Sequence, residues 1–184
     1  SDQDLEIAKM IYGGKINIEI VSALRKNGSR GVGLSGIDGG LIRAKRRGVT
    51  KMLDRETGEY REVDFGHVGD VISIDIDLLL TLVEAGYIPV ISCLGADDDG
   101  NIYNINADVV AEKIASYIKA DKLINVSDVS GVLRDPADKE SLISYLDVEE
   151  ARKLIEEGVI TKGMIPKVES CLSAIEGGVK RAHI

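Results

Sequence analysis

Helical spacing of apolar residues is clearest in the first 26 positions of the chain. Ile16, Ile20 and Leu24 recur four apart, and the following Asn27-Gly28 is a typical helix stop. The same spacing predicts four further helices, which begin at polar residues or proline, and several of them end at glycine. These helices are expected to begin at Asp75, near Ala107, at Asp147 with Glu150 completing a capping box, and at Pro166.

Short apolar stretches bounded by glycine lie between the predicted helices, and this pattern is typical of strands. The alternation in residues 49–63, around the turn-like DRETGEY, predicts a surface hairpin instead. Strands that alternate with helices indicate an α/β fold with a mostly parallel sheet. The predicted strands lie at residues 30–36, 41–47, 87–95, 122–127 and 179–184.

Composition narrows the class of protein. Apolar residues make up 44% of the 184 positions and charged residues 29%, with one Phe and no Trp, which describes a soluble globular protein with an aliphatic core. The net charge of −8 argues against nucleic-acid or anionic-membrane binding. The most apolar stretch, residues 77–95, is broken by Glu84 and Pro89, so we do not expect a membrane span. Cys93 and Cys171 show no CxxC spacing and are expected to be reduced thiols in a cytoplasmic protein.

The approach to the helix near residue 107 is unusually polar. Asn106 is suited to be the N-cap, which would put Asp108 in the first turn, where the helix dipole favours an ionised carboxylate. Such a carboxylate could hold cationic groups in place. An ordinary capped helix with an acid in its first turn explains Asn106 and Asp108 equally well, but it gives Asn104 no task.

Lys167 is a second unusual residue, because it follows Pro166 at the start of a predicted helix. A cation at a helix N-terminus opposes the dipole and costs about 0.3–1 kcal/mol at an exposed site. A bound anion would reverse that sign, since the free N–H groups and the ammonium would converge on the same oxygens. The alternative interpretation is a solvated lysine that is tolerated at small cost.

The stretch SDVSGVL follows a predicted strand, and open parallel sheets bind ligands beyond the carboxyl ends of their strands. Gly131 would let backbone approach a ligand, and Val132 and Leu133 could cover a flat apolar ring, although a plain turn has the same sequence pattern. Residues 33–40, GLSGIDGG, lack the spacing of either common phosphate loop. His67 has no nucleophilic Ser or Cys motif beside it, and we assign it no role.

Five motifs occur in a fixed order along the chain: GGKINIEIV, GHVGDV, NINAD, SDVSGVL and GMIPKVESC. Together they closely resemble the N-acetylglutamate kinases of the amino acid kinase superfamily, over essentially the whole chain. The resemblance implies a three-layer α/β/α sandwich around a mainly parallel sheet. It also implies two regions: residues 1–100 as the remainder of an amino-acid-binding lobe, with a surface hairpin at about 41–65, and residues 101–184 as the nucleotide-binding lobe.

The activity that this resemblance implies is transfer of the γ-phosphoryl group of ATP to the side-chain carboxylate of N-acetyl-L-glutamate, a step of arginine biosynthesis. Magnesium would arrive bound to the nucleotide. Such chemistry depends on positioning and electrostatic stabilisation and needs no protein nucleophile.

Individual roles follow by matching position. Lys167 would stabilise the charge on the transferring phosphoryl group, and Asp108 would orient the catalytic lysines, so the two should lie within roughly 10 Å of each other. Asn104 would bind the acetylglutamate, with Asn106 beside it. The implied nucleotide pocket comprises Asp128, Val129, Ser130, Gly131, Val132, Leu133, Ile160, Thr161, Gly163 and Met164.

The family also has a glycine-rich loop with a second lysine, an HGGG-type loop and a substrate-gripping arginine, none of which occurs in these 184 residues. We therefore expect an N-terminal part to be missing and this polypeptide alone to be poorly active. Ile37 replaces a lysine common in the family, so a carrier-linked aminoadipate kinase of lysine biosynthesis remains an alternative. A non-catalytic nucleotide-sensing module is a second alternative. The resemblance further implies a homo-oligomer, dimer or hexamer, without nucleic-acid or membrane partners.

Overall fold

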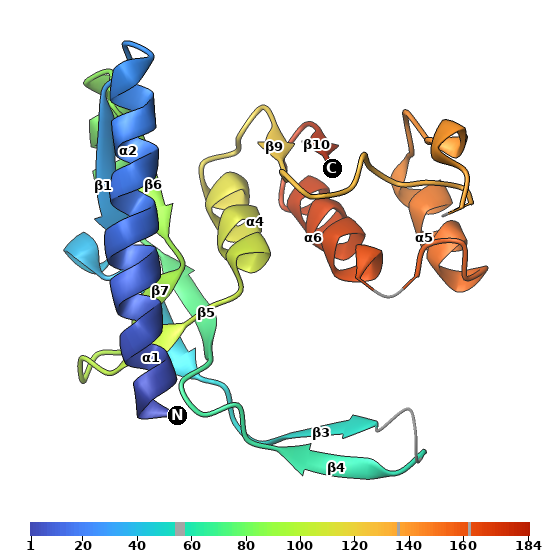
Figure 1. Cartoon of the computed structure of the whole chain (residues 1–184), viewed down its shortest axis with the longest axis horizontal. Coiled ribbons are helices and arrows are strands. Elements are labelled where there is room, and N and C mark those ends of the chain that lie inside the picture. The colour runs from blue at the N-terminus through green and yellow to red at the C-terminus, as the bar shows by residue number, and fades with distance from the viewer. Residues whose placement is uncertain (54–57, 136, 162) are drawn as a thin grey trace. The chain divides into compact units, whose positions relative to one another are not determined.

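Residues 2–26 form one continuous helix, as their apolar spacing predicts. In the computed structural model, which describes residues 1–53, 58–135, 137–161 and 163–184, α1 (Asp2–Ala8), η1 (Lys9–Ile16) and α2 (Asn17–Lys26) follow without a break (Figure 1). The middle segment η1 is a π-helix, a wider spiral that the sequence pattern did not predict. Leu5 and Ala8 before this segment and Asn17 after it are buried.

Asn17 connects the long helix to a pair of strands. Strands β1 (Gly31–Ser35) and β6 (Ile88–Ser92) pair in parallel, and the Asn17 side-chain amide donates to the Leu34 carbonyl (3.1 Å) and the Val90 carbonyl (2.8 Å). Gly33 makes room for this side chain, because a β-carbon there would overlap Asn17 Oδ1. One buried amide thus fixes the helix against both strands.

The remaining strands of the first part of the chain form a four-stranded sheet in the order β5-β2-β7-β8. Its centre is parallel, between β2 and β7, while β5 and β8 add antiparallel edges. Leu41, which precedes β2, and Ile42, its first residue, are fully buried. The sheet therefore combines the predicted parallel pairing with short antiparallel returns. Its members are β2 (Ile42–Arg46), β5 (Gly69–Ile74), β7 (Leu94–Ala96) and β8 (Ile102–Asn104).

The predicted surface hairpin is present. Strands β3 (Thr50–Leu53) and β4 (Tyr60–Val63) pair antiparallel, and β3 is exposed throughout (Figure 1). Residues 54–57 of the expected DRETGEY turn lie outside the described residues. Helix α3 (Asp77–Glu84) is present as predicted, but its N-cap is Ile76 and not Asp75, although the Asp75 carboxylate accepts a hydrogen bond from the Asp77 amide (3.0 Å).

The chain divides into two compact units, Ser1–Val110 and Ala111–Ile184, and the boundary falls within α4 (Ala107–Tyr117). In the second unit, α4 and α6 (Met164–Glu176) pack around Ala115 and Ala174, beside the parallel strands β9 and β10. Whether the two units bind the amino acid and the nucleotide respectively stays a prediction. The other elements of this unit are β9 (Leu123–Ile124), η3 (Lys139–Ser141), α5 (Val148–Glu156) and β10 (Ala182–His183).

Several predicted boundaries in the second unit need correction. Helix α6 begins at Met164, two residues before Pro166, because the Met164 amide already bonds to the Thr161 carbonyl. Proline is tolerated at the third helical position because the first amides of a helix have no intrahelical partner. The strand predicted at 122–127 is only two residues long. The predicted N-cap of α5 is confirmed, since Asp147 accepts from the Glu150 amide at 2.7 Å, but among the described residues no bond from the Asp147 amide to the Glu150 carboxylate completes the capping box.

Candidate functional site

Asn104 stands at the end of β8, held by its main chain. Its amide donates to the His67 carbonyl (2.8 Å), and it forms a parallel bridge with Val68. Its side-chain oxygen Oδ1 is buried and has no hydrogen-bond partner among the described residues. A buried acceptor without a donor weakens a fold by about 1–3 kcal/mol, so an oxygen in this state is suited to receive a donor from a ligand.

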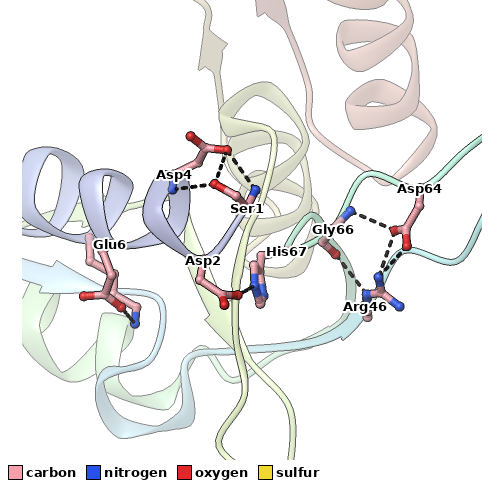
Figure 2. Close-up of polar contacts among 9 residues, drawn as sticks. Ser1, Asp2, Asp4, Glu6, Arg46, Asp64, Gly66 and His67 are labelled. Atoms are coloured by element: carbon pink, nitrogen blue, oxygen red, sulfur yellow. Dashed lines mark hydrogen bonds and ion pairs between the residues drawn. The ribbon is translucent and has the colours of Figure 1, made fainter.

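The loop that carries His67 is braced on two sides (Figure 2). The Arg46 guanidinium donates to both Asp64 carboxylate oxygens (2.8 Å each) and to the Gly66 carbonyl (3.0 Å). The His67 ring nitrogen Nε2 lies 2.6 Å from Asp2 Oδ1 at the start of α1, and this contact lowers the pKa of the Asp2 carboxyl. From the sequence we gave His67 no role. In the structure, the His67 carbonyl accepts from the Asn104 amide, and the His67 ring contacts Asp2 at the start of α1.

The start of α4 confirms the predicted cap. Asn106 Oδ1 accepts from the amides of Asp108 (2.8 Å) and Val109 (3.2 Å), and Asp108 lies in the first turn, half-buried. The apolar positions along this helix differ in their exposure. Val110 is buried, but Tyr117 and Ile118 are exposed.

In the second unit, three of the expected nucleotide residues come together in one apolar cluster. Val132 and Ile160 are buried beside Val168, and Met164 packs against them. Gly131 precedes this cluster with a φ of 131°, and a β-carbon there would lie 3.1 Å from Leu142 Cδ1. Only glycine fits this turn without strain. The other expected nucleotide residues lie outside the cluster: Asp128, Val129, Ser130, Thr161 and Gly163 are exposed and Leu133 is half-buried.

A pocket of about 810 Å³ lies next to the same loop. Of the ten expected nucleotide residues, it is lined by Ser130, Gly131 and Val132. Its walls are otherwise the α6 face around Cys171, the segment from Leu142 to Val148, and the last five residues, including Lys180 and Arg181. The other expected nucleotide residues lie in the apolar cluster or near the surface outside the pocket.

Lys167 is the fourth residue of α6 and is half-buried. The N-cap of this helix is Gly163, which has no side-chain oxygen to offer the first amides, so an anion could bind there. Asp108 belongs to the first unit and Lys167 to the second, and their shared phosphate site stays a prediction. Within the described ranges there is no cluster of three His, Cys, Asp or Glu residues suited to a metal ion. Nor is any helix in those ranges long and apolar enough to cross a membrane.

The family model "Amino acid kinase family" matches the chain from residue 1 to residue 184. This chain belongs to the amino acid kinase family. A curated relative, the acetylglutamate kinase of Methanosphaera stadtmanae, is 52% identical over 99% of the chain and 61% of its own length. Our chain thus spans about three fifths of this kinase.

Solved structures agree on the fold. A crystal structure from Streptococcus mutans UA159 superposes with a TM-score of 0.79 at 28% identity, over 99% of this chain and 67% of that one. The N-acetylglutamate synthase of Neisseria gonorrhoeae, solved with coenzyme A and N-acetyl-glutamate, reaches 0.81 at 24% identity over 99% of this chain and 38% of that one, which supports the fold alone. The predicted α/β fold of amino acid kinases is confirmed.

Proposed function

We propose that the full-length protein containing this chain transfers the γ-phosphoryl group of MgATP to the side-chain carboxylate of N-acetyl-L-glutamate. The observation that carries the proposal is 52% identity to a curated acetylglutamate kinase over nearly every residue of the chain. Further curated relatives with the same name, from Heliobacterium modesticaldum among others, favour this acceptor over a carrier-linked aminoadipate. A carboxylate oxygen forms the new P–O bond, the bond to the β,γ-bridging oxygen breaks, and ADP leaves.

On the acceptor side, we assign Asn104 to the acetylglutamate. Its buried Oδ1 can only accept a hydrogen bond, so it needs an N–H or O–H donor. The acetamido N–H of the substrate is such a donor. Asn106 would act beside it, although its own Oδ1 is already engaged with two helix amides.

On the phosphoryl side, we assign Lys167 to the charge that develops on the transferring group and Asp108 to the orientation of lysines around it. Both side chains are half-buried. Asp108 lies in the first turn of α4, and Lys167 is the fourth residue of α6. Loss of one such electrostatic contact typically costs about 10²–10³ in kcat.

For the nucleotide, we assign the loop from Asp128 to Leu133 together with Ile160, Thr161, Gly163 and Met164. Val132 and Ile160 are 8% and 2% exposed, so their side chains would shape the loop while backbone groups meet the nucleotide. The exposed Ser130 and Thr161 add hydroxyls that can bind phosphate or ribose oxygens.

The test is a kinetic assay on the full-length protein, with ADP release coupled to a spectroscopic readout and the acyl phosphate trapped as its hydroxamate. Lys167→Met should lower kcat by about 10²–10³. The matched control is Lys153→Met on α5, an exposed lysine paired with Glu157 at 3.7 Å, which should leave kcat unchanged. ATP binding without any hydroxamate would contradict the proposal and favour a nucleotide sensor.

We further propose that this activity is cytoplasmic and that the enzyme is a homo-oligomer. Cys93 and Cys171 are both reduced thiols, which suits a reducing compartment. Size-exclusion chromatography with light scattering on the full-length protein would test the assembly, and a monomer at micromolar concentration would contradict it.

A further inference from the structure

Ser92 is a buried hydroxyl with no hydrogen-bond partner. It is the last residue of β6, is 7% exposed, and its Oγ meets no donor or acceptor in the described ranges. The hydroxyl lies 4.0 Å from the point where a β-carbon of Gly13 would stand, so it faces the π-helix η1. Among the described residues, only the Ser92 hydroxyl and the Asn104 side-chain oxygen are buried side-chain atoms in this state.

The sheet register brings these two atoms into one layer. Leu94 Cδ1 lies 3.7 Å from the same Gly13 point as the Ser92 hydroxyl, so Ser92 and Leu94 present their side chains to the same helix. Leu94 stands directly opposite Asn104 in the β7–β8 ladder. Residues opposite each other in an antiparallel pair share a face of the sheet. Ser92, Leu94 and Asn104 therefore lie on the face that η1 covers.

Gly13 of η1 is exposed and has no side chain to extend toward Ser92 and Leu94. A π-helical turn within a longer helix often marks a functional site. Native proteins rarely leave buried polar atoms unpaired, and such exceptions tend to occur where a ligand completes the set.

We propose that Ser92 is a further contact for the acceptor substrate and contributes to its recognition. Its hydroxyl donates to an oxygen of the acceptor, beside Asn104, whose Oδ1 accepts from an N–H of the same molecule. A hydroxyl can serve a carbonyl or a carboxylate oxygen equally, and acetylglutamate offers both. This inference rests on the proposed function for the nature of the acceptor, and it adds a residue that none of the sequence motifs singled out.

The experiment uses Ser92→Ala in the full-length enzyme and measures stability and kinetics together. Because the unliganded hydroxyl has no partner, its removal should leave the melting temperature of the unliganded protein unchanged or higher. The KM for the acceptor should rise about tenfold, equivalent to about 1.4 kcal/mol, while the KM for ATP stays constant. Acceptor alone should also stabilise Ser92→Ala less than wild type in a thermal-shift assay. Ser73→Ala, a half-buried serine on β5, is the matched control.

A structural role gives the opposite pattern. If Ser92→Ala lowers the melting temperature of the unliganded protein by about 5 °C and leaves the acceptor KM unchanged, the hydroxyl serves the fold and the inference is overturned. Failure of the proposed function is a separate result, seen as wild-type enzyme that ignores acetylglutamate. In that case the KM of Ser92→Ala is compared with the KM of wild type for the acceptor that the wild-type enzyme does phosphorylate.

Discussion

Gly177, which follows α6, should not tolerate even a methyl group. Its backbone angles, φ −71° and ψ −5°, suit any residue, so the constraint is steric. A β-carbon would overlap Ser116 Oγ on α4, and it would lie 2.7 Å from Ser116 Cβ and 3.2 Å from the Ser173 carbonyl oxygen. Overpacking of this kind costs about 1–3 kcal/mol. Alanine also restricts the unfolded chain, which stabilises the variant by about 0.4–1 kcal/mol. The net effect of Gly177→Ala is therefore a decrease of about 1–2 kcal/mol in the free energy of unfolding.

The assay is urea unfolding of the full-length protein, followed by circular dichroism. Gly48→Ala is the control, because a β-carbon at Gly48 meets no atom within 4 Å. Ser116→Gly removes both atoms that crowd the site, so Gly177→Ala made in that background should cost less than about 0.5 kcal/mol. An equal loss in both backgrounds would show that the two helices do not approach each other here, and the reasoning would fail.

Three further predictions concern single side chains. Asn17→Ala should lower the free energy of unfolding by about 2–4 kcal/mol, because two strand carbonyls lose their shared donor; a loss below about 0.5 kcal/mol in urea titration would contradict it. The pKa of the Asp97 carboxyl is lowered from 3.8 to about 2, first because the Tyr103 hydroxyl donates to it. The folded state therefore binds this proton more weakly than the unfolded state does. The contribution of Asp97 to the free energy of unfolding is complete above about pH 4 and is lost as the pH falls through about 2. Asp97→Asn should flatten the stability curve over that range, and an unchanged slope would count against the bond. Burial raises the pKa of the Cys93 thiol, so in a Cys171→Ser variant iodoacetamide at pH 8 should alkylate Cys93 several-fold more slowly than free cysteine.

Local signals in the sequence located the helix starts and turns well. Asn106 and Asp147 were identified as caps from residue type and spacing alone, and both bonds are present. Caps are predictable because the donor and acceptor lie within three residues of each other. The predicted start of α6, Pro166, lies two residues after the observed start at Met164. Pro166 is compatible with several positions in the first turn, so the sequence leaves its exact place open.

Contacts between distant segments were beyond the reach of the sequence. Nothing near Asn17 announces that its amide reaches Leu34 and Val90, 17 and 73 residues away. Ser92 looks like an ordinary strand residue, and its unpaired state appears only when the helix above it is in place. Asn104 received its role only from the resemblance to amino acid kinases, whereas Asp108 and Lys167 were already candidates because of their charges at predicted helix starts. The geometry added the main-chain support of Asn104 by His67.

The π-helical segment sets the rotational phase of the long helix. Nine residues separate Ala8 from Asn17, which in an α-helix of 3.6 residues per turn amounts to about two and a half turns and would put them on opposite sides. With eight of those residues in a spiral of roughly 4.4 per turn, the separation is close to two turns, and both side chains are buried. An α-helix with two residues fewer would also reach about two turns. The chain therefore carries about two residues more between Ala8 and Asn17 than an α-helix needs to keep them in phase, and it accommodates them by widening over Lys9–Ile16.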